Sequence, residues 1–245
     1  MKIIVDTCVW YELGRNPALY EKVKDMPLVP TIISLIEVGH TANLFDGQRA
    51  ETEQAIVRMM RWSPDMILNT PFQFIADMPA PEMKGLDLLL HFTALVANGA
   101  AIPEEQMGLL RNVRDKVLKP KTDWALSSNS MAAQTNTPET KRKIKNNNTL
   151  PLTWELILTY IKNQTGNQDV YDLDPNQCEL LVRVWDQFIR LQQMQHVVAE
   201  ENDLYDILNM AYVKPGDKYW TIETRWLNRA KESGCTSYLF VPPTS

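Results

Sequence analysis

The chain opens on a short apolar run that stops at a carboxylate. Residues 3–5 are the β-branched run Ile-Ile-Val, and Asp6 and Thr7 follow directly. Such a run fits a strand that is buried on both faces, as in a parallel sheet. The charge at its end therefore belongs at the rim of a sheet, where open parallel sheets bind their ligands.

Helical and extended patterns then alternate as far as residue 62. We expect a helix around residues 16–25 and a short strand at residues 28–30. A second helix opens in PTIISLIEVGHTANLFDGQ, where Ser34 is a favourable N-cap and Gly47 a favourable stop. A third helix should cover residues 50–62.

The long middle of the chain, residues 65–199, predicts mainly helices. GLDLLLHFTALVANGA is apolar nearly all round, whereas PEEQMGLLRNVRDKVLK is amphipathic. Between residues 127 and 149 the chain turns polar, with a basic run at 141–145, and we expect a loop or linker there. Two helices should follow, in LPLTWELILTYIKNQ and PNQCELLVRVWDQFIRLQQMQ.

In the last part of the chain, helical and extended patterns alternate again. We expect a helix in NDLYDILNMAYV, a strand in DKYWT, a helix in ETRWLNRAKESG and a strand in SYLFV. Strands at both ends of the chain, separated by helices, predict a parallel α/β sheet assembled from both ends. The domain would then have a core at residues 1–62 and 200–243 and a long helical insertion at 65–199.

Composition narrows the class of protein. The 245 residues are 44% hydrophobic and 22% charged, with a formal net charge of −5, as in an ordinary globular protein. This charge argues against non-specific coating of nucleic acid, but not against a nuclease with an acidic metal site. Three scattered cysteines and three scattered histidines predict neither a disulfide framework nor a zinc site. Without a signal-peptide pattern or a membrane-spanning run, we expect a cytoplasmic protein.

Each candidate acid also has a purely structural explanation. Asp6 can cap a helix or turn, and Glu37 can form an S-x-x-E capping box with Ser34. Asp203 and Asp206 open the helix in NDLYDILNMAYV, where acids favour the macrodipole. The same explanation applies to Glu223 after the DKYWT strand.

The structural explanations are less satisfactory when the acids are considered together. Asp6, Glu37, Asp206 and Glu223 each fall at the carboxyl end of an expected strand or in the first turn of a rim helix. In a parallel sheet they would converge, and their repulsion and desolvation would be costly without a cation. Oxygen ligands of this kind suit Mg²⁺ or Mn²⁺.

These motifs resemble those of the PIN-domain ribonucleases. That family opens on a strand ending in Asp-Thr-Asn, matched here by VDTCVW, and continues into a Ser-x-x-Glu helix, matched by TIISLIEVGH. A late acid opens a helix, matched by NDLYDILNMAYV, and a last strand ends in Thr-x-Asp, matched by YWTIETRW. The resemblance covers residues 1–62 and 200–243 and implies a single PIN-like α/β domain.

The resemblance implies a metal-dependent endoribonuclease that uses Mg²⁺ or Mn²⁺ to activate a water. The implied catalytic acids are Asp6, Glu37, Asp206 and Glu223, and Asp203 is a further metal-binding acid. Two positions depart from the family pattern, because Cys8 replaces Asn and Glu223 replaces Asp. The candidate substrate-binding residues are Thr7, Ser34, Lys218, Thr221 and Arg225.

The partners and the alternatives follow from the same residues. RNA is the expected substrate, and the basic run at 141–145 is either solvated surface or an RNA contact. The family includes toxins held by an antitoxin, so a toxin-type role with such a partner, or a homo-oligomer, stays open. The main alternative is a non-catalytic PIN-like RNA-binding or scaffold protein. A haloacid dehalogenase-type phosphatase would need an Asp where Cys8 stands.

Overall fold

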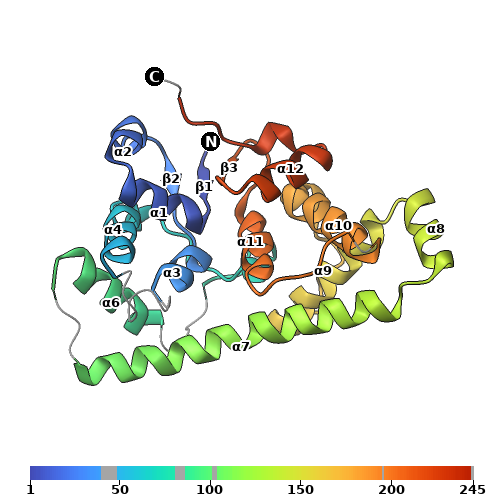
Figure 1. Ribbon diagram of the computed structural model, residues 1–245, viewed down its shortest axis with the longest axis horizontal. Helices are drawn as coiled ribbons and strands as arrows, with labels where there is room; N and C mark the ends of the chain where they lie inside the picture. Colours follow the sequence, from blue (N-terminus) through green and yellow to red (C-terminus); the bar gives the residue numbers. More distant parts are fainter. Residues whose placement is uncertain (40–48, 81–85, 101–103, 195, 244–245) are drawn as a thin grey trace.

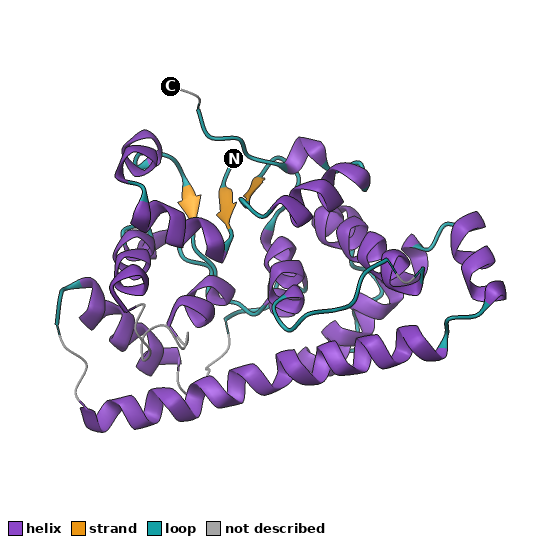
Figure 2. Ribbon diagram, in the orientation of Figure 1, coloured by secondary structure: helices purple, strands orange, loops and turns teal. Residues whose placement is uncertain are grey.

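The computed structural model describes residues 1–39, 49–80, 86–100, 104–194 and 196–243. In these ranges the protein is an α/β structure, with a small three-stranded sheet surrounded by helices (Figure 1, Figure 2). This confirms the α/β class expected from the sequence. Gly47, the expected stop of a helix, lies outside the described residues. No helix within the described ranges is both long and apolar enough to cross a membrane.

The elements alternate along the first part of the chain and are helical through the middle. The strands are β1 (Ile3–Val5), β2 (Leu28–Val29) and β3 (Lys218–Trp220). The helices are α1 (Thr7–Arg15), α2 (Pro17–Val23), α3 (Ile32–Gly39), α4 (Arg49–Met60), α5 (Pro71–Ile75), α6 (Leu86–Ala97), α7 (Glu104–Gln134), α8 (Pro138–Asn146), α9 (Leu150–Thr165), α10 (Glu179–Gln193), α11 (Asp203–Asn209) and α12 (Thr224–Glu232).

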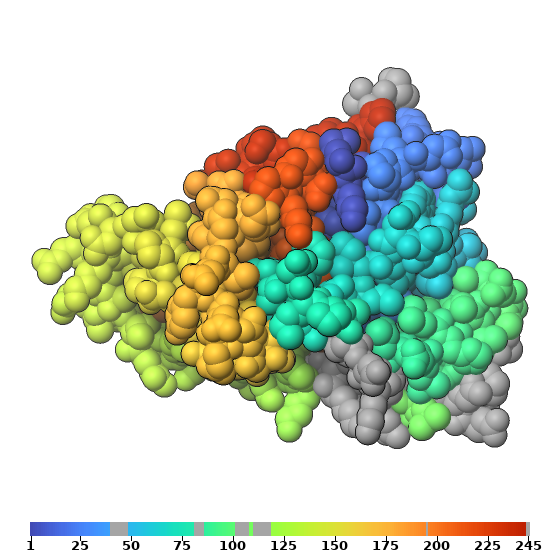
Figure 3. Space-filling model, turned by 180° about the vertical axis from the view of Figure 1, so that it is seen from behind, coloured from blue at the N-terminus to red at the C-terminus, as the bar shows by residue number. Residues whose placement is uncertain are grey.

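Both ends of the chain build the sheet, as the sequence predicts. The strand order is β2-β1-β3, and β1 pairs in parallel with both neighbours. Val5 lies opposite Trp220, so the carboxyl ends of β1 and β3 meet at one edge. Viewed from behind, the first residues of the chain lie beside its C-terminal segments (Figure 3).

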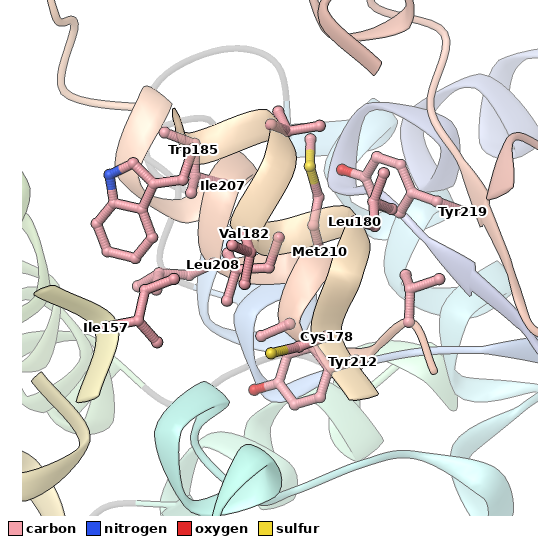
Figure 4. Close-up of a cluster of buried hydrophobic side chains, with 14 of the residues drawn as sticks. Ile157, Cys178, Leu180, Val182, Trp185, Ile207, Leu208, Met210, Tyr212 and Tyr219 are labelled. Carbon is pink, nitrogen blue, oxygen red and sulfur yellow. The ribbon is translucent and has the colours of Figure 1, made fainter. Parts of the chain in front are cut away.

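Each face of the sheet packs on its own hydrophobic cluster, because side chains alternate along a strand. Ile4 and Tyr219 face a cluster built largely from α9, α10 and α11 (Figure 4). Ile3, Val5 and Trp220 face the opposite way, into a cluster with α1, α2 and α4. The sheet is therefore the middle layer of three, and its open edge at Val5 and Trp220 is where the expected site should lie.

Most of the segment at residues 127–149 is helical, so the expected loop is wrong. α7 continues to Gln134 and α8 follows after a short turn. Polar side chains of this part of α7 have partners. Ser128 donates to Gln192 of α10 at 3.0 Å, and Asn129 donates to the Ala199 carbonyl at 2.9 Å. A polar helix is stable here because its side chains bond to α10 and to the chain before α11. In Figure 1 α7 runs along the lower edge of the molecule.

Two other local expectations are corrected. Residues 7–15 form α1, which the sequence did not predict, because Asp6 caps the helix and Val9, Trp10 and Leu13 give it a buried face. The expected last strand is reduced to one parallel bridge between Tyr219 and Leu239. The prolines that follow at 242 and 243 have no backbone N–H to extend a strand ladder.

Candidate metal centre at the carboxyl end of the sheet

The candidate site forms where β1 and β3 end side by side. Asp6 follows β1 directly, and its backbone N–H donates to the Trp220 carbonyl at 2.9 Å. Thr221 follows β3 directly, and its side chain hydrogen-bonds to Asp6. Asp6 is 1% exposed and also accepts the Thr7 N–H at 2.8 Å, as the N-cap of α1. The carboxylate is therefore both a helix cap and the centre of the site.

Three potential metal-ligand atoms converge at this edge. One atom each from Asp6, Cys8 and Glu223 lies within 4.8 Å of the others. Cys8 donates its thiol to Asp6 Oδ2 at 3.4 Å, and its sulfur lies 3.6 Å from Thr221 Oγ1. Two carboxylates and a sulfur around one point form a donor set that fits a divalent cation. Cys8, which the sequence marked only as a departure, is thus part of the group.

Asp6 bears an electrostatic cost in this position. Burial raises its pKa to about 6, and the nearby carboxylates of Glu37 and Glu223 act in the same direction. Hydrogen bonds from Thr221 and Cys8 oppose the rise without cancelling it. A cation among these acids would remove the cost, because it favours the ionised form.

Asp206 lies close enough to belong to the same charge cluster. It is 5% exposed, and its Oδ2 accepts the Trp226 indole N–H at 2.8 Å. Burial raises the pKa of Asp206 to about 9, and Asp6, Glu37 and Glu223 add to the rise. The structure therefore places four acids near one another: Asp6 after β1, Glu37 in α3, Asp206 in α11 and Glu223 at the start of α12.

Arg225 is the main internal cation of the cluster. Its guanidinium lies 2.7 Å from Asp203 Oδ1, 2.9 Å from Asp206 Oδ2 and 2.9 Å from Glu223 Oε2. It also reaches Glu200 at 3.2 Å. Arg225 was expected to contact phosphate, and here its donors are turned towards protein carboxylates.

Glu37 is not one of the converging donors, because two other residues bind its carboxylate. Thr7 Oγ1 donates to Glu37 Oε2 at 2.6 Å, and Lys121 Nζ lies 2.8 Å from Oε1. Lys121 comes from α7, in the middle of the chain, and also donates to Asn202 Oδ1 at 3.0 Å. Glu37 is thus near the cluster, but both its oxygens are engaged.

The remaining expected residues divide into those near the site and those elsewhere. Asp203 accepts the Glu200 N–H at 2.9 Å and pairs with Arg225, outside the converging group. Ser34 does not cap α3, because Thr31 accepts the Ser34 N–H at 3.2 Å and the helix begins at Ile32. Two candidate substrate contacts lack access to the edge. The Ser34 hydroxyl is buried and donates to the Val5 carbonyl, while Lys218 lies at the opposite end of β3 and donates to the Ser237 carbonyl.

Sequence reasoning missed two residues of this site. Lys121 sits in a long polar helix, and nothing in its neighbourhood marks it as different from other lysines. Trp226 lies three residues after Glu223, a helical spacing that places both on one side of a helix start. That spacing was a usable signal for Trp226, whereas Lys121 needed the fold.

No protein-family model, curated protein or solved structure matches this chain. The function must therefore be argued from the geometry of the site.

Proposed function

We propose that the protein is a PIN-like, metal-dependent endoribonuclease that hydrolyses RNA phosphodiester bonds with Mg²⁺ or Mn²⁺. The single observation that carries the proposal is the convergence of Asp6, Cys8 and Glu223 within 4.8 Å, beside Asp206 and Glu37. Acids buried at the carboxyl edge of a parallel sheet are a costly arrangement that cation binding explains. The order of these residues along the chain supports the PIN resemblance.

The donor set fits the proposed cation by its chemistry. Asp6 and Glu223 would supply the carboxylate oxygens that Mg²⁺ and Mn²⁺ prefer. Burial and the nearby Asp6 carboxylate raise the pKa of the Cys8 thiol, so its sulfur would be the weakest of the three donors. When bound, such a cation supplies Lewis-acid chemistry, acidifying water and stabilising charge at a phosphodiester.

The residues of the chain supply orientation and charge. Thr221 and the Thr7 N–H fix the Asp6 carboxylate, and the Trp226 indole fixes Asp206. Arg225 is one-third exposed, and its guanidinium pairs with Asp203, Asp206 and Glu223, so it holds these carboxylates in place around the centre.

A second function has one observation in its favour. Arg225 and Lys121 already neutralise part of the negative charge of the acidic cluster without a metal ion. A non-catalytic RNA-binding or scaffold protein could retain such a cluster as a purely structural ion-pair network. The two functions differ in whether RNA is cut.

The decisive experiment is cleavage of labelled single-stranded and structured RNA with Mg²⁺, Mn²⁺ or EDTA. We expect cleavage with either metal, none with EDTA, and products with 5′-phosphate and 3′-hydroxyl ends by mass spectrometry. Asp6→Asn should abolish cleavage, while Asp172→Asn, at an exposed acid, should preserve it. Cleavage that survives Asp6→Asn, or no cleavage under every condition, would favour the scaffold.

A further inference from the structure

We propose that Lys121 of the helical insertion is a positioning residue of the metal centre. It pairs with Glu37 and acts as a fixed counter-ion for that carboxylate. In this arrangement Lys121 supplies a positive charge that a second cation would otherwise supply, and the centre takes one divalent ion. The inference rests on the proposed function and extends it, because it makes the insertion part of the site.

The contacts of Lys121 are those of a fixed charge. Its side chain is 6% exposed, its ammonium lies 2.8 Å from Glu37 Oε1, and it donates to Asn202 Oδ1 at 3.0 Å. The ammonium also lies 4.3 Å from the centre of the Tyr205 ring, which adds a cation–π contact. Lysine is almost never fully buried unless it is paired, so this burial needs the carboxylate.

Exposed ion pairs elsewhere in the protein differ from the Lys121–Glu37 pair in their burial. Lys143 and Glu139 on α8 lie at the same distance, 2.8 Å, but their side chains are 65% and 64% exposed. Such a pair is screened by solvent and contributes little. Lys121 and Glu37 are 84 residues apart and both mostly buried, so they connect the insertion to the acids.

The pairing determines which acids remain for a cation. Lys121 and Thr7 occupy the two oxygens of Glu37, and Arg225 pairs with Asp206 and with one oxygen of Glu223. Asp6 and the other oxygen of Glu223 are left to converge with Cys8. Lys121 and Arg225, together with Arg229 near Asp203 and Asp206, thus offset part of the acidic charge, and one divalent ion would offset more of it.

The test is Mn²⁺ titration of the full chain, with free Mn²⁺ measured by electron paramagnetic resonance. We expect one Mn²⁺ per chain in the wild type and about tenfold tighter binding in Lys121→Met, because a nearby positive charge is lost and Glu37 is freed. RNA cleavage should fall in the same variant. Lys119→Met, at an exposed lysine on the same helix, and Lys121→Arg should keep wild-type affinity.

A double variant keeps the test decisive if the single one folds poorly. Glu37→Gln with Lys121→Met removes both charges and leaves no buried unpaired ion, so circular dichroism should show a folded chain. Its Mn²⁺ affinity should return to within about threefold of the wild type, since the opposite charges cancel. Loss of a purely structural bridge would instead weaken Mn²⁺ binding together with stability.

The outcomes separate this inference from the proposed function. Equal or weaker Mn²⁺ binding in Lys121→Met would overturn the inference even if the wild type cuts RNA. Tighter binding in Lys121→Met would support it even if the wild type cuts no RNA, in which case the proposed function fails alone. Absence of Mn²⁺ binding in every variant would overturn both.

Discussion

Arg225 and Trp226, neighbours in sequence, donate to the same oxygen of Asp206, at 2.9 Å and 2.8 Å. The two side chains come from α12, and Asp206 comes from α11. The contact therefore fixes the relative position of two helices and one buried charge. The first two predictions concern these donors.

Arg225→Met should lower the free energy of unfolding by about 2–3 kcal/mol, because Asp203 and Asp206 would remain buried without their cation. This is less than for a fully buried pair, since Arg225 is 33% exposed. Urea unfolding at pH 9.5, above the pKa of about 9 to which burial raises Asp206, measures the change. Arg183→Met is the matched control, because Arg183 pairs with Glu179 in an (i, i+4) surface pair, and it should cost below about 0.5 kcal/mol. Equal losses would contradict the prediction.

Trp226→Phe should cost more than Trp10→Phe. Both indoles are fully buried, so both substitutions lose similar packing. Only Trp226 also loses a hydrogen bond to a carboxylate, worth about 1–3 kcal/mol when the acceptor stays buried. The Trp10 indole N–H has no partner to lose. Urea unfolding of the two variants side by side gives the comparison, and a larger loss for Trp10→Phe would refute it.

The stability of the metal-free protein should fall as pH rises. Burial raises the pKa of Asp6 to about 6 and that of Asp206 to about 9, from an ordinary value of 3.8. Between the ordinary pKa of 3.8 and its folded pKa, each acid binds more protons in the folded state than in the unfolded state. The contribution of each acid to the free energy of unfolding is therefore lost as pH rises through its folded pKa. Thermal unfolding in EDTA between pH 5 and pH 8 measures this fall.

Asp6→Asn should reduce that pH dependence. The neutral amide removes the ionisation of Asp6, so at pH 8 in EDTA the variant should exceed the wild type by on the order of 2 kcal/mol. Mn²⁺ should raise the melting temperature of the wild type more at pH 8 than at pH 5, because fewer protons compete with it. In Asp6→Asn, Mn²⁺ should raise the melting temperature only slightly. Identical pH profiles would mean that Asp6 does not bear the cost described.

Ser34→Ala should affect stability and leave RNA binding unchanged. The Ser34 hydroxyl is buried and donates to the Val5 carbonyl at 3.1 Å, so its loss should cost about 1–2 kcal/mol. Ser130→Ala, at an exposed position, should change unfolding by less than about 0.5 kcal/mol. Unfolding in urea and RNA affinity by fluorescence anisotropy are both needed. Weaker RNA affinity in the folded Ser34→Ala chain would restore Ser34 as a substrate contact.

Local pattern was enough to predict the strands of the sheet and several helices. The apolar run at Ile3–Val5 and the alternation around Lys218–Trp220 are short-range signals, and Gly234 ends α12 with a left-handed φ of +78°. The same reasoning placed Asp6 and Glu223 at one edge, because parallel strands share their carboxyl edge.

Other features depend on contacts far along the chain. α1 carries the β-prone sequence Thr-Cys-Val-Trp, and its helix is stabilised by an Asp6 cap and by packing that no local window contains. Residues 127–134 looked like a linker because their side chains are polar, yet Asn129 and Ser128 bond to groups more than 60 residues away. Lys121 meets Glu37 only because α7 passes the acids.

The pairing of β1 with β3 has a consequence for synthesis of the chain. More than 200 residues separate Val5 from Trp220, so Asp6 cannot meet Thr221 or Glu223 until residue 223 has left the ribosome. Until then one edge of β1 lacks its neighbour and can pair with other chains. A nascent or truncated product that lacks β3 would therefore carry an aggregation-prone edge and no assembled centre.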